Sequence, residues 1–361
     1  MLIKGRCGKS TLLHQLLKRE KNYFYCRFED SRLSGFAIED YPQLDVAFHE
    51  TFGKSDVYFF DEIQNIPSWE IFVRSLLERG KKCYITGSNA SLLSKELGTR
   101  LTGRHLDFEL FPFSYVEMLQ YTSKSSSAAS FEKYLTLGGF PEFLFHKQME
   151  PIQEIFNDVL LRDIVVRYGL REIRTLQELA RFLISNTGKE FSYNKLAKML
   201  DVSVMTIIAY VSYLEEAYLL FTLPKFSFSY QKQLVNPKKI YVIDNGFAAA
   251  NSASFSGDKG RLLENAVFLH LRRKYKELFY FKGKKECDFL VREKGKITRA
   301  VQVCWKVTEE NKTREIEGLQ EALQALKLEN GAIITFDQED KLGNIELIPA
   351  WKFFLTAPKN L

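Results

Sequence analysis

Cysteine is scarce in this sequence, and its few occurrences form no recognisable pattern. The chain has 5 cysteines among 361 residues; they are scattered, and no two have the C-x-x-C spacing. An odd, scattered set argues against a disulfide framework and against a zinc site. Reduced thiols of this kind are typical of cytosolic proteins, so we expect a cytoplasmic location.

Long apolar runs and a strong excess of charge are also missing. No run reaches the length of a transmembrane helix, so we expect no membrane span. Met1–Lys4 leads directly into a glycine loop, which leaves no room for a signal peptide. The formal net charge of +6 permits nucleic-acid binding but does not require it.

The composition that is present belongs to a globular protein with more than one domain. Hydrophobic residues make up 45% of the chain and charged residues 27%, which argues against disorder. A length of 361 residues is too great for one ordinary core, so we expect two or three domains. Aromatic residues, at 14%, should be prominent in the cores.

A glycine loop near the N-terminus, followed by Gly8-Lys9-Ser10-Thr11, resembles the phosphate and magnesium half of a nucleotide site. Backbone N–H groups of the loop and the positive end of the following helix would cradle the phosphates of ATP. Lys9 would contact the β- and γ-phosphates, and Ser10 would ligate Mg²⁺.

This loop departs from the full pattern G-x-x-x-x-G-K-[ST]. The pattern requires glycine at position 3, which is Ile3, and Gly5 stands two residues too close to Gly8. Either the loop is shortened, with fewer N–H groups around the phosphates, or the site is degraded. A chance match is the third interpretation.

The run Val57–Phe60 is wholly apolar or aromatic and is followed at once by Asp61 and Glu62. Such a run is typical of a central parallel strand buried on both faces. Ligands of open α/β sheets bind at the carboxyl ends of the strands, where Asp61 would hold Mg²⁺ and Glu62 would orient the attacking water. A solvated acidic turn is the alternative.

A second buried strand is expected over Lys82–Thr86, and Asn89 follows it. Beside the strand that ends at Asp61, Asn89 would sense the γ-phosphate; the alternative is a turn with a helix N-cap. Arg100 and Arg104 are candidates to reach a phosphate, in cis or from a neighbouring subunit of a homo-oligomer. For either arginine, a solvated side chain is the alternative.

A set of motifs extends these signals: Phe60–Glu70, Ile85–Ala90, Leu101–Arg104, Leu110–Ser114 and Gly138–Pro141. Together they resemble the prokaryotic AAA-type ATPases that pair an N-terminal P-loop domain with a C-terminal conserved domain of unknown function. The similarity runs over nearly the whole chain, and the segment Asp61–Trp69 is specific.

This resemblance implies that Lys9 and Ser10 are the Walker A residues, that Asp61 and Glu62 are the Walker B pair, and that Asn89 is the sensor. Members of the family usually carry a further segment before the P-loop and a loop two residues longer, both absent from this sequence. A mis-set start or a truncated gene is one interpretation of that difference.

The middle of the chain resembles a winged helix-turn-helix. A short helix over Phe191–Leu200, a turn at Asp201–Ser203 and a second helix over Val204–Ala217 precede a predicted strand. In DNA binding the second helix would enter the major groove. It contains no Arg or Lys, so a packing or protein-contact role is favoured over tight DNA binding.

In the last third, Glu264 on a predicted helix, Asp288 on a strand and Gln302 on the next strand resemble the PD-(D/E)xK nuclease core. In that core, carboxylates hold Mg²⁺ and a lysine activates water. Its lysine position falls on Cys304, and Lys306 lies one strand period further. An inactive nuclease-like fold is therefore favoured, with Gln302 as a buried structural residue the alternative.

We therefore expect an α/β protein with a P-loop NTPase (AAA-like) parallel sheet, a helical and winged-helix middle, and a C-terminal restriction-endonuclease-like domain. The expected boundaries are 1–115 for the ATPase core, 116–185 for a helical lid or linker, 186–230 for the winged helix-turn-helix and 231–361 for the nuclease-like domain.

Three functions remain open from the sequence. The first is an ATP-dependent switch that acts on a protein or DNA partner, with Glu62, Asn89 and Arg104 as catalytic residues and Gly5 and Thr11 in the phosphate loop. The second is a nucleic-acid-processing enzyme that ATP regulates. The third is a non-catalytic interaction protein with a degraded nucleotide site.

Overall fold

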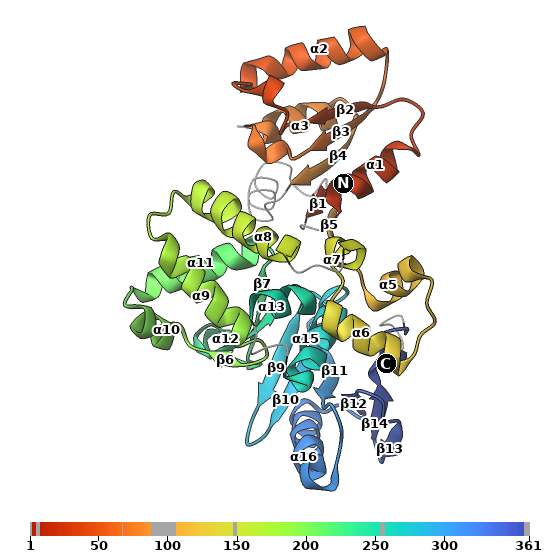
Figure 1. Ribbon diagram of the computed structural model, residues 1–361, viewed down its shortest axis with the longest axis vertical. Helices are drawn as coiled ribbons and strands as arrows, with labels where there is room; N and C mark the ends of the chain where they lie inside the picture. The colour runs from red at the N-terminus through yellow and green to blue at the C-terminus, as the bar shows by residue number, and fades with distance from the viewer. Residues whose placement is uncertain are drawn as a thin grey trace. The chain divides into compact units, whose positions relative to one another are not determined.

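The computed structural model describes residues 2–4, 8–66, 68–87, 106–146, 150–252 and 257–356. The chain divides into two compact units. Figure 1 colours the chain by residue number, from red at the N-terminus to blue at the C-terminus. The first unit contains Met1–Phe111 together with Glu216–Tyr218, and the second contains Pro112–Glu215 and Leu219–Leu361. The finer division expected after residue 115 lies within the second unit and stays a prediction.

The first unit is built on a five-stranded sheet with the order β2-β3-β4-β1-β5. All its paired strands run parallel. The strands are β1 (Leu2–Lys4), β2 (Phe24–Arg27), β3 (Val57–Asp61), β4 (Lys82–Gly87) and β5 (Asp107–Glu109), and the helices are α1 (Lys9–Leu17), α2 (Tyr41–Phe52) and α3 (Trp69–Glu78). The N-terminal parallel sheet that the sequence predicts is confirmed.

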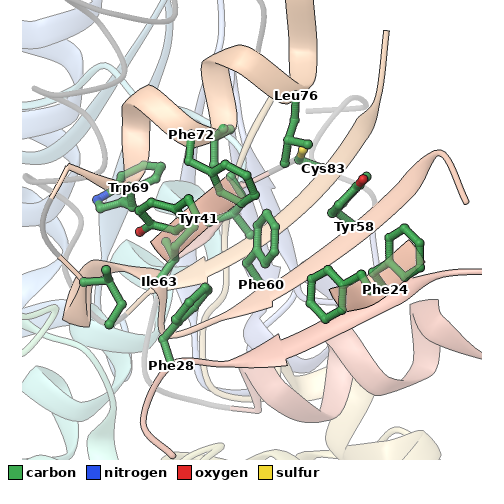
Figure 2. Packing of buried hydrophobic residues seen from close by; sticks show 14 residues of the cluster. Phe24, Phe28, Tyr41, Tyr58, Phe60, Ile63, Trp69, Phe72, Leu76 and Cys83 are labelled. Carbon is green, nitrogen blue, oxygen red and sulfur yellow. The ribbon is translucent and has the colours of Figure 1, made fainter. Parts of the chain in front are cut away.

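Aromatic side chains fill the space between this sheet and the helices α2 and α3, as the composition predicts (Figure 2). Tyr41 at the start of α2 stacks on Phe72 of α3, with ring centroids 4.4 Å apart. Phe60 of β3 is fully buried and packs against the same Phe72 ring at 5.7 Å. Such burial stabilises a core by about 1.5–3 kcal/mol for each large side chain and fixes the end of β3.

The second unit begins with a helical segment. Its members are α5 (Tyr115–Thr122), α6 (Ala128–Leu137), α7 (Pro141–His146), α8 (Glu150–Asp158), a π-helical stretch Val159–Val166 and α9 (Ile173–Ser185). Capping boxes formed by Ser114 with Glu117 and by Ser127 with Ser130 begin α5 and α6, so the polar run between these helices caps α6.

Two short helices then meet at a sharp bend. The axes of α10 (Tyr193–Leu200) and α11 (Val204–Glu216) differ by 107°. Around them lies a three-stranded antiparallel sheet of order β6-β8-β7, made by β6 (Glu190–Phe191), β7 (Leu220–Pro224) and β8 (Lys238–Val242), with α12 (Tyr230–Val235) between the last two strands. Among the described residues no single helix is long and apolar enough to cross a membrane, and α10 with α11 meets that test only as a bent pair.

The C-terminal part contains a six-stranded mixed sheet of order β13-β14-β12-β11-β10-β9. The strands β9, β10 and β11 pair antiparallel, whereas β11, β12 and β14 run parallel to one another. The elements are α13 (Asn245–Asn251), α15 (Lys259–Arg272), β9 (Leu278–Lys282), β10 (Glu286–Glu293), β11 (Lys296–Val303), α16 (Glu309–Leu326), β12 (Gly331–Thr335), β13 (Asp340–Leu342), β14 (Ile345–Pro349) and α17 (Ala350–Phe353).

Candidate nucleotide site and a buried carboxylate cluster

A lysine and a carboxylate from distant segments meet in the first unit. Gly8 has a φ of 73°, a left-handed conformation that glycine adopts without strain, and α1 begins immediately after it at Lys9. The Lys9 ammonium lies 3.1 Å from Oε1 of Glu62, and both side chains are largely buried. The structure thus brings the predicted Walker A lysine next to one member of the predicted Walker B pair.

Asp61, the last residue of β3, is 1% exposed and is held by two hydroxyl groups. Its Oδ1 accepts a hydrogen bond from Thr86 Oγ1, and its Oδ2 accepts a longer one, 3.4 Å, from the Tyr25 hydroxyl. Burial, followed by the charge of Asp61, raises the pKa of Tyr25 to about 12. Tyr25 therefore remains a neutral donor near pH 7, and Asp61 keeps a fixed orientation.

Thr86 also organises the neighbouring Glu62. The same Oγ1 that donates to Asp61 accepts a hydrogen bond of 3.0 Å from the Glu62 N–H. Thr86 is completely buried on β4, the strand next to β3. The sequence predicts Thr86 at the end of a strand without a role for it; a polar residue that ends an apolar strand marks the position but does not reveal its partner.

Glu62 occupies an unusual backbone conformation. Its φ of 52° and ψ of 46° lie in the left-handed region, which non-glycine residues rarely adopt. Its Oε2 accepts a hydrogen bond of 2.6 Å from Gln64 Nε2, and its Oε1 faces Lys9. Backbone strain of this kind is common at functional sites, where it aims one side chain at a ligand.

The other predicted site residues of this unit are distributed as follows. Ser10 and Thr11 lie in the first turn of α1, directly after Lys9, and both are exposed. Gly5, Asn89, Arg100 and Arg104 lie outside the described residues, so their roles stay predictions.

The structure brings Glu264, Asp288 and Gln302 together in the second unit, and the nuclease-like role given to them stays a prediction. They come from α15, β10 and β11 and line a pocket of about 420 Å³. The amide oxygen of Gln302 accepts a hydrogen bond of 3.1 Å from the Asp288 N–H, and its nitrogen donates to Glu315 at 2.7 Å. Gln302 is thus a satisfied buried amide, which agrees with its structural interpretation.

A buried lysine that sequence reasoning missed lies at the centre of this group. The Lys239 ammonium contacts Glu264 at 3.1 Å, Glu286 at 2.7 Å and Asp288 at 3.0 Å; we call these three acids the carboxylate cluster. Burial opposes the charged ammonium, but Glu264 and the other acids raise the pKa of Lys239 well above its ordinary value. Lys239 therefore remains charged.

The alternation of strand β8 explains the position of Lys239. Tyr241, two residues further on the same strand, donates a hydrogen bond of 2.7 Å to Glu264, so both side chains point to one face. Burial raises the pKa of Glu264 to about 7 against the lowering effect of Lys239. Burial likewise raises the pKa of Cys304, at the lysine position of the nuclease pattern, to about 11, so it is a neutral thiol.

Comparison with known proteins gives three family matches along the chain. Residues 2–119 match an AAA domain, residues 128–256 match a domain of unknown function (DUF8612), and residues 259–353 match another (DUF4143). An AAA domain implies nucleotide binding and suggests ATPase activity, usually with Mg²⁺.

Similar proteins occur in archaea and bacteria. The uncharacterized protein MJ1544 of Methanocaldococcus jannaschii is 35% identical over 97% of this chain and 86% of its own length. An uncharacterized protein of Haemophilus influenzae is 30% identical, over 87% of this chain and 83% of its own length. This chain therefore belongs to the family of MJ1544, and its N-terminal part matches an AAA domain.

Proposed function

We propose that this chain binds ATP, hydrolyses it with the help of Mg²⁺, and uses the nucleotide state as a switch that acts on a partner. The observation that carries the proposal is the 3.1 Å contact between Lys9 and Glu62. The contact places the ammonium of Lys9, which is suited to bind phosphate, beside the Glu62 carboxylate, which would orient water. Both lie at the carboxyl end of β3.

In this proposal the triphosphate of ATP replaces Glu62 as the partner of Lys9. Phosphate oxygens carry more negative charge than one carboxylate, and the N–H groups at the start of α1 favour an anion there. Once the triphosphate has taken the place of Glu62 beside Lys9, Glu62 is available to orient the attacking water and to accept its proton. The hydrogen bond from Gln64 restricts where the Glu62 carboxylate can turn.

The residues present fit a Mg²⁺ ion bound together with ATP. Ser10 and Asp61 supply hard oxygen ligands of the kind that Mg²⁺ prefers, and Thr86 fixes the orientation of Asp61 through a hydrogen bond. The ion would neutralise charge on the phosphates. Thr86 already holds the Asp61 carboxylate in place by a hydrogen bond, so Asp61 would not have to reorient when Mg²⁺ binds.

A protein is the favoured partner of the switch. The 107° angle between α10 and α11 and the antiparallel strands around them support a winged helix-turn-helix. The second helix exposes apolar side chains, with Met205 71% and Ile208 39% exposed, and it lacks Arg and Lys. An apolar, uncharged helix face suits a protein surface better than a phosphate backbone.

The alternative function is nucleic-acid processing regulated by ATP. The chain order α15, β9, β10, β11, α16, β12 supports the resemblance to the nuclease core, because helix and strand carry Glu264 and Asp288 toward one pocket. The amide Gln302 and the neutral thiol of Cys304 speak against cleavage. A plasmid-nicking assay with Mg²⁺ or Mn²⁺ tests it, and metal-dependent nicking that is lost in Asp288→Ala would establish this alternative.

Titration of ATP with Mg²⁺ into the full chain tests the proposal. We expect Lys9→Ala to bind ATP about 10- to 100-fold more weakly, because a hydrogen bond to a charged group contributes about 1.5–3 kcal/mol. Lys18→Ala, an exposed lysine at the end of the same helix, is the matched control and should bind as the wild type does. Equal binding by all three proteins, or binding by none, would refute the proposal.

A further inference from the structure

We infer that the carboxylate cluster is a cation site whose resident cation is the ammonium of Lys239, so that it takes no divalent metal in the natural chain. Lys239, on β8, lies outside the α15-to-β12 segment that contributes Glu264, Glu286 and Asp288. Its ammonium occupies the point on which the three carboxylates converge.

The contacts of this ammonium are complete. A lysine ammonium has three donor hydrogens, and Lys239 has three carboxylate partners, at 2.7, 3.0 and 3.1 Å. Lys239 is 2% exposed, so water does not compete for these hydrogen bonds. A buried ammonium is tolerated only with such compensation, since an isolated buried charge costs several kcal/mol.

What distinguishes this group from a metal site is the ammonium itself: the three carboxylates converge on Lys239, and a divalent cation at that point would meet its positive charge. Asp288 accepts from Lys239 through Oδ1 and from the Val303 N–H, at 3.0 Å, through Oδ2. Oε1 of Glu264 accepts from both Lys239 and Tyr241. The donor set present therefore does not fit a divalent cation, and no group of three or more acidic, His or Cys side chains in the described part of the chain is arranged to hold one.

The same geometry predicts what removal of the ammonium does. Without Lys239, three acids from α15 and β10 would face one another in a pocket of about 420 Å³ without their shared counter-charge. Carboxylate oxygens around a small polar cavity are the ligands that Mg²⁺ and Mn²⁺ prefer. Replacing Lys239 by a neutral residue of similar length should therefore open a site for a divalent cation.

Mn²⁺ binding to the full chain without nucleotide, measured by electron paramagnetic resonance, tests this inference. All proteins carry Asp61→Asn, so that the proposed ATPase site does not contribute. We call the Asp61→Asn protein the parent. Mn²⁺ binding to the parent should not change when Asp288→Asn is added, whereas adding Lys239→Met to the parent should create one new Mn²⁺ site. Adding Asp288→Asn to that variant should weaken the new site by roughly 10-fold or more.

Lys284→Met is the matched control, because Lys284 is an exposed lysine that lines the same pocket. It should behave as the parent does. Asp288-dependent Mn²⁺ binding by the parent, or no gain of a site in folded Lys239→Met, would overturn the inference. If Lys239→Met does not fold, the melting temperature of the parent is measured with and without Mn²⁺. We expect no change. A rise in melting temperature with Mn²⁺ that Asp288→Asn abolishes would contradict the inference.

Discussion

Nζ of Lys9 and Oε1 of Glu62 lie 3.1 Å apart, with 9% and 13% of their side chains exposed. The two groups belong to α1 and to the turn after β3, so their contact joins the two halves of the proposed nucleotide site. Because the pair is largely buried, removing either partner leaves a poorly solvated charge. In the proposed function, this contact would link ATP binding by Lys9 to the orientation of Glu62.

Glu62→Gln should separate binding from hydrolysis. The amide keeps the size of the side chain but cannot accept a proton from water, so we expect the hydrolysis rate to fall by about 10²- to 10⁴-fold. ATP affinity should stay the same or increase, because Lys9 loses a competing carboxylate. Phosphate release and ATP titration measure the two effects on one preparation. An unchanged rate would remove Glu62 from the mechanism.

Thr86→Val should destabilise the first unit and weaken ATP binding. The substitution keeps the shape of the side chain but removes the donor to Asp61 and the acceptor for the Glu62 N–H, both in a fully buried position. Leaving buried polar groups unpaired costs about 1–3 kcal/mol. Calorimetry of thermal unfolding measures the loss.

Thr86→Ser is the matched control for this position. It keeps the hydroxyl and loses one methyl group, so its cost should be near 0.8 kcal/mol, roughly that of one buried carbon. Equal destabilisation by the serine and valine variants would mean that packing, not hydrogen bonding, explains the importance of Thr86.

The sequence predicts those parts of the site that depend on local patterns. Lys9 follows a glycine loop, and Asp61 and Glu62 follow an apolar strand, so period and spacing predict all three as candidates, and the structure places Lys9 beside Glu62. Glu264 and Asp288 are found in the same way, from a helix and a strand in a familiar order. Each of these signals lies within a short stretch of chain.

Thr86 and Lys239 could not be assigned from the sequence because their roles depend on strand pairing. Thr86 contacts Asp61 only because β4 pairs with β3 in the observed register. Lys239 contacts Asp288, which lies 49 positions further along the chain, and its strand precedes the helix and the two strands that carry the nuclease-like pattern. No local rule places a lysine among three acids, because its burial depends on partners that folding supplies.

Gly139→Ala should destabilise the second unit. A Cβ at Gly139 would lie 2.0 Å from the backbone oxygen of Phe113, and the Gly139 N–H donates to Asp244 at 2.6 Å. The backbone must shift to accept a methyl group, which costs about 1–3 kcal/mol. The Phe113 N–H also donates to the Gly139 oxygen at 2.7 Å, so the two backbones fit directly against each other.

Gly257→Ala is the control, since a Cβ at Gly257 meets nothing within 4 Å. It should change the free energy of unfolding by less than about 0.5 kcal/mol, as surface substitutions usually do. Calorimetry on both variants makes the comparison. If both glycine variants unfold at the wild-type temperature, the contact with Phe113 does not constrain the fold.

The stability of the chain should fall in mild acid through His270. Burial lowers its pKa from 6.5 to about 3, and its ring lies 4.6 Å from that of Phe354. The unfolded chain therefore binds a proton between pH 6.5 and 3 that the folded chain excludes, and stability decreases as the pH falls through that window. The loss is up to about 2 kcal/mol between pH 7 and pH 5.

Replacing His270 separates its contribution from that of acids such as Asp244. Burial raises the pKa of Asp244 to about 6, so its contribution to stability increases, rather than decreases, as the pH falls. His270→Phe and His270→Gln both remove the titrating group, whereas only the first keeps an aromatic ring beside Phe354. We therefore expect wild type to lose more stability than both variants when urea unfolding is compared at pH 7 and pH 5, and the two variants to share one pH dependence despite different stabilities. A wild-type pH dependence that matches theirs would mean that His270 is protonated in the folded protein as readily as in the unfolded chain.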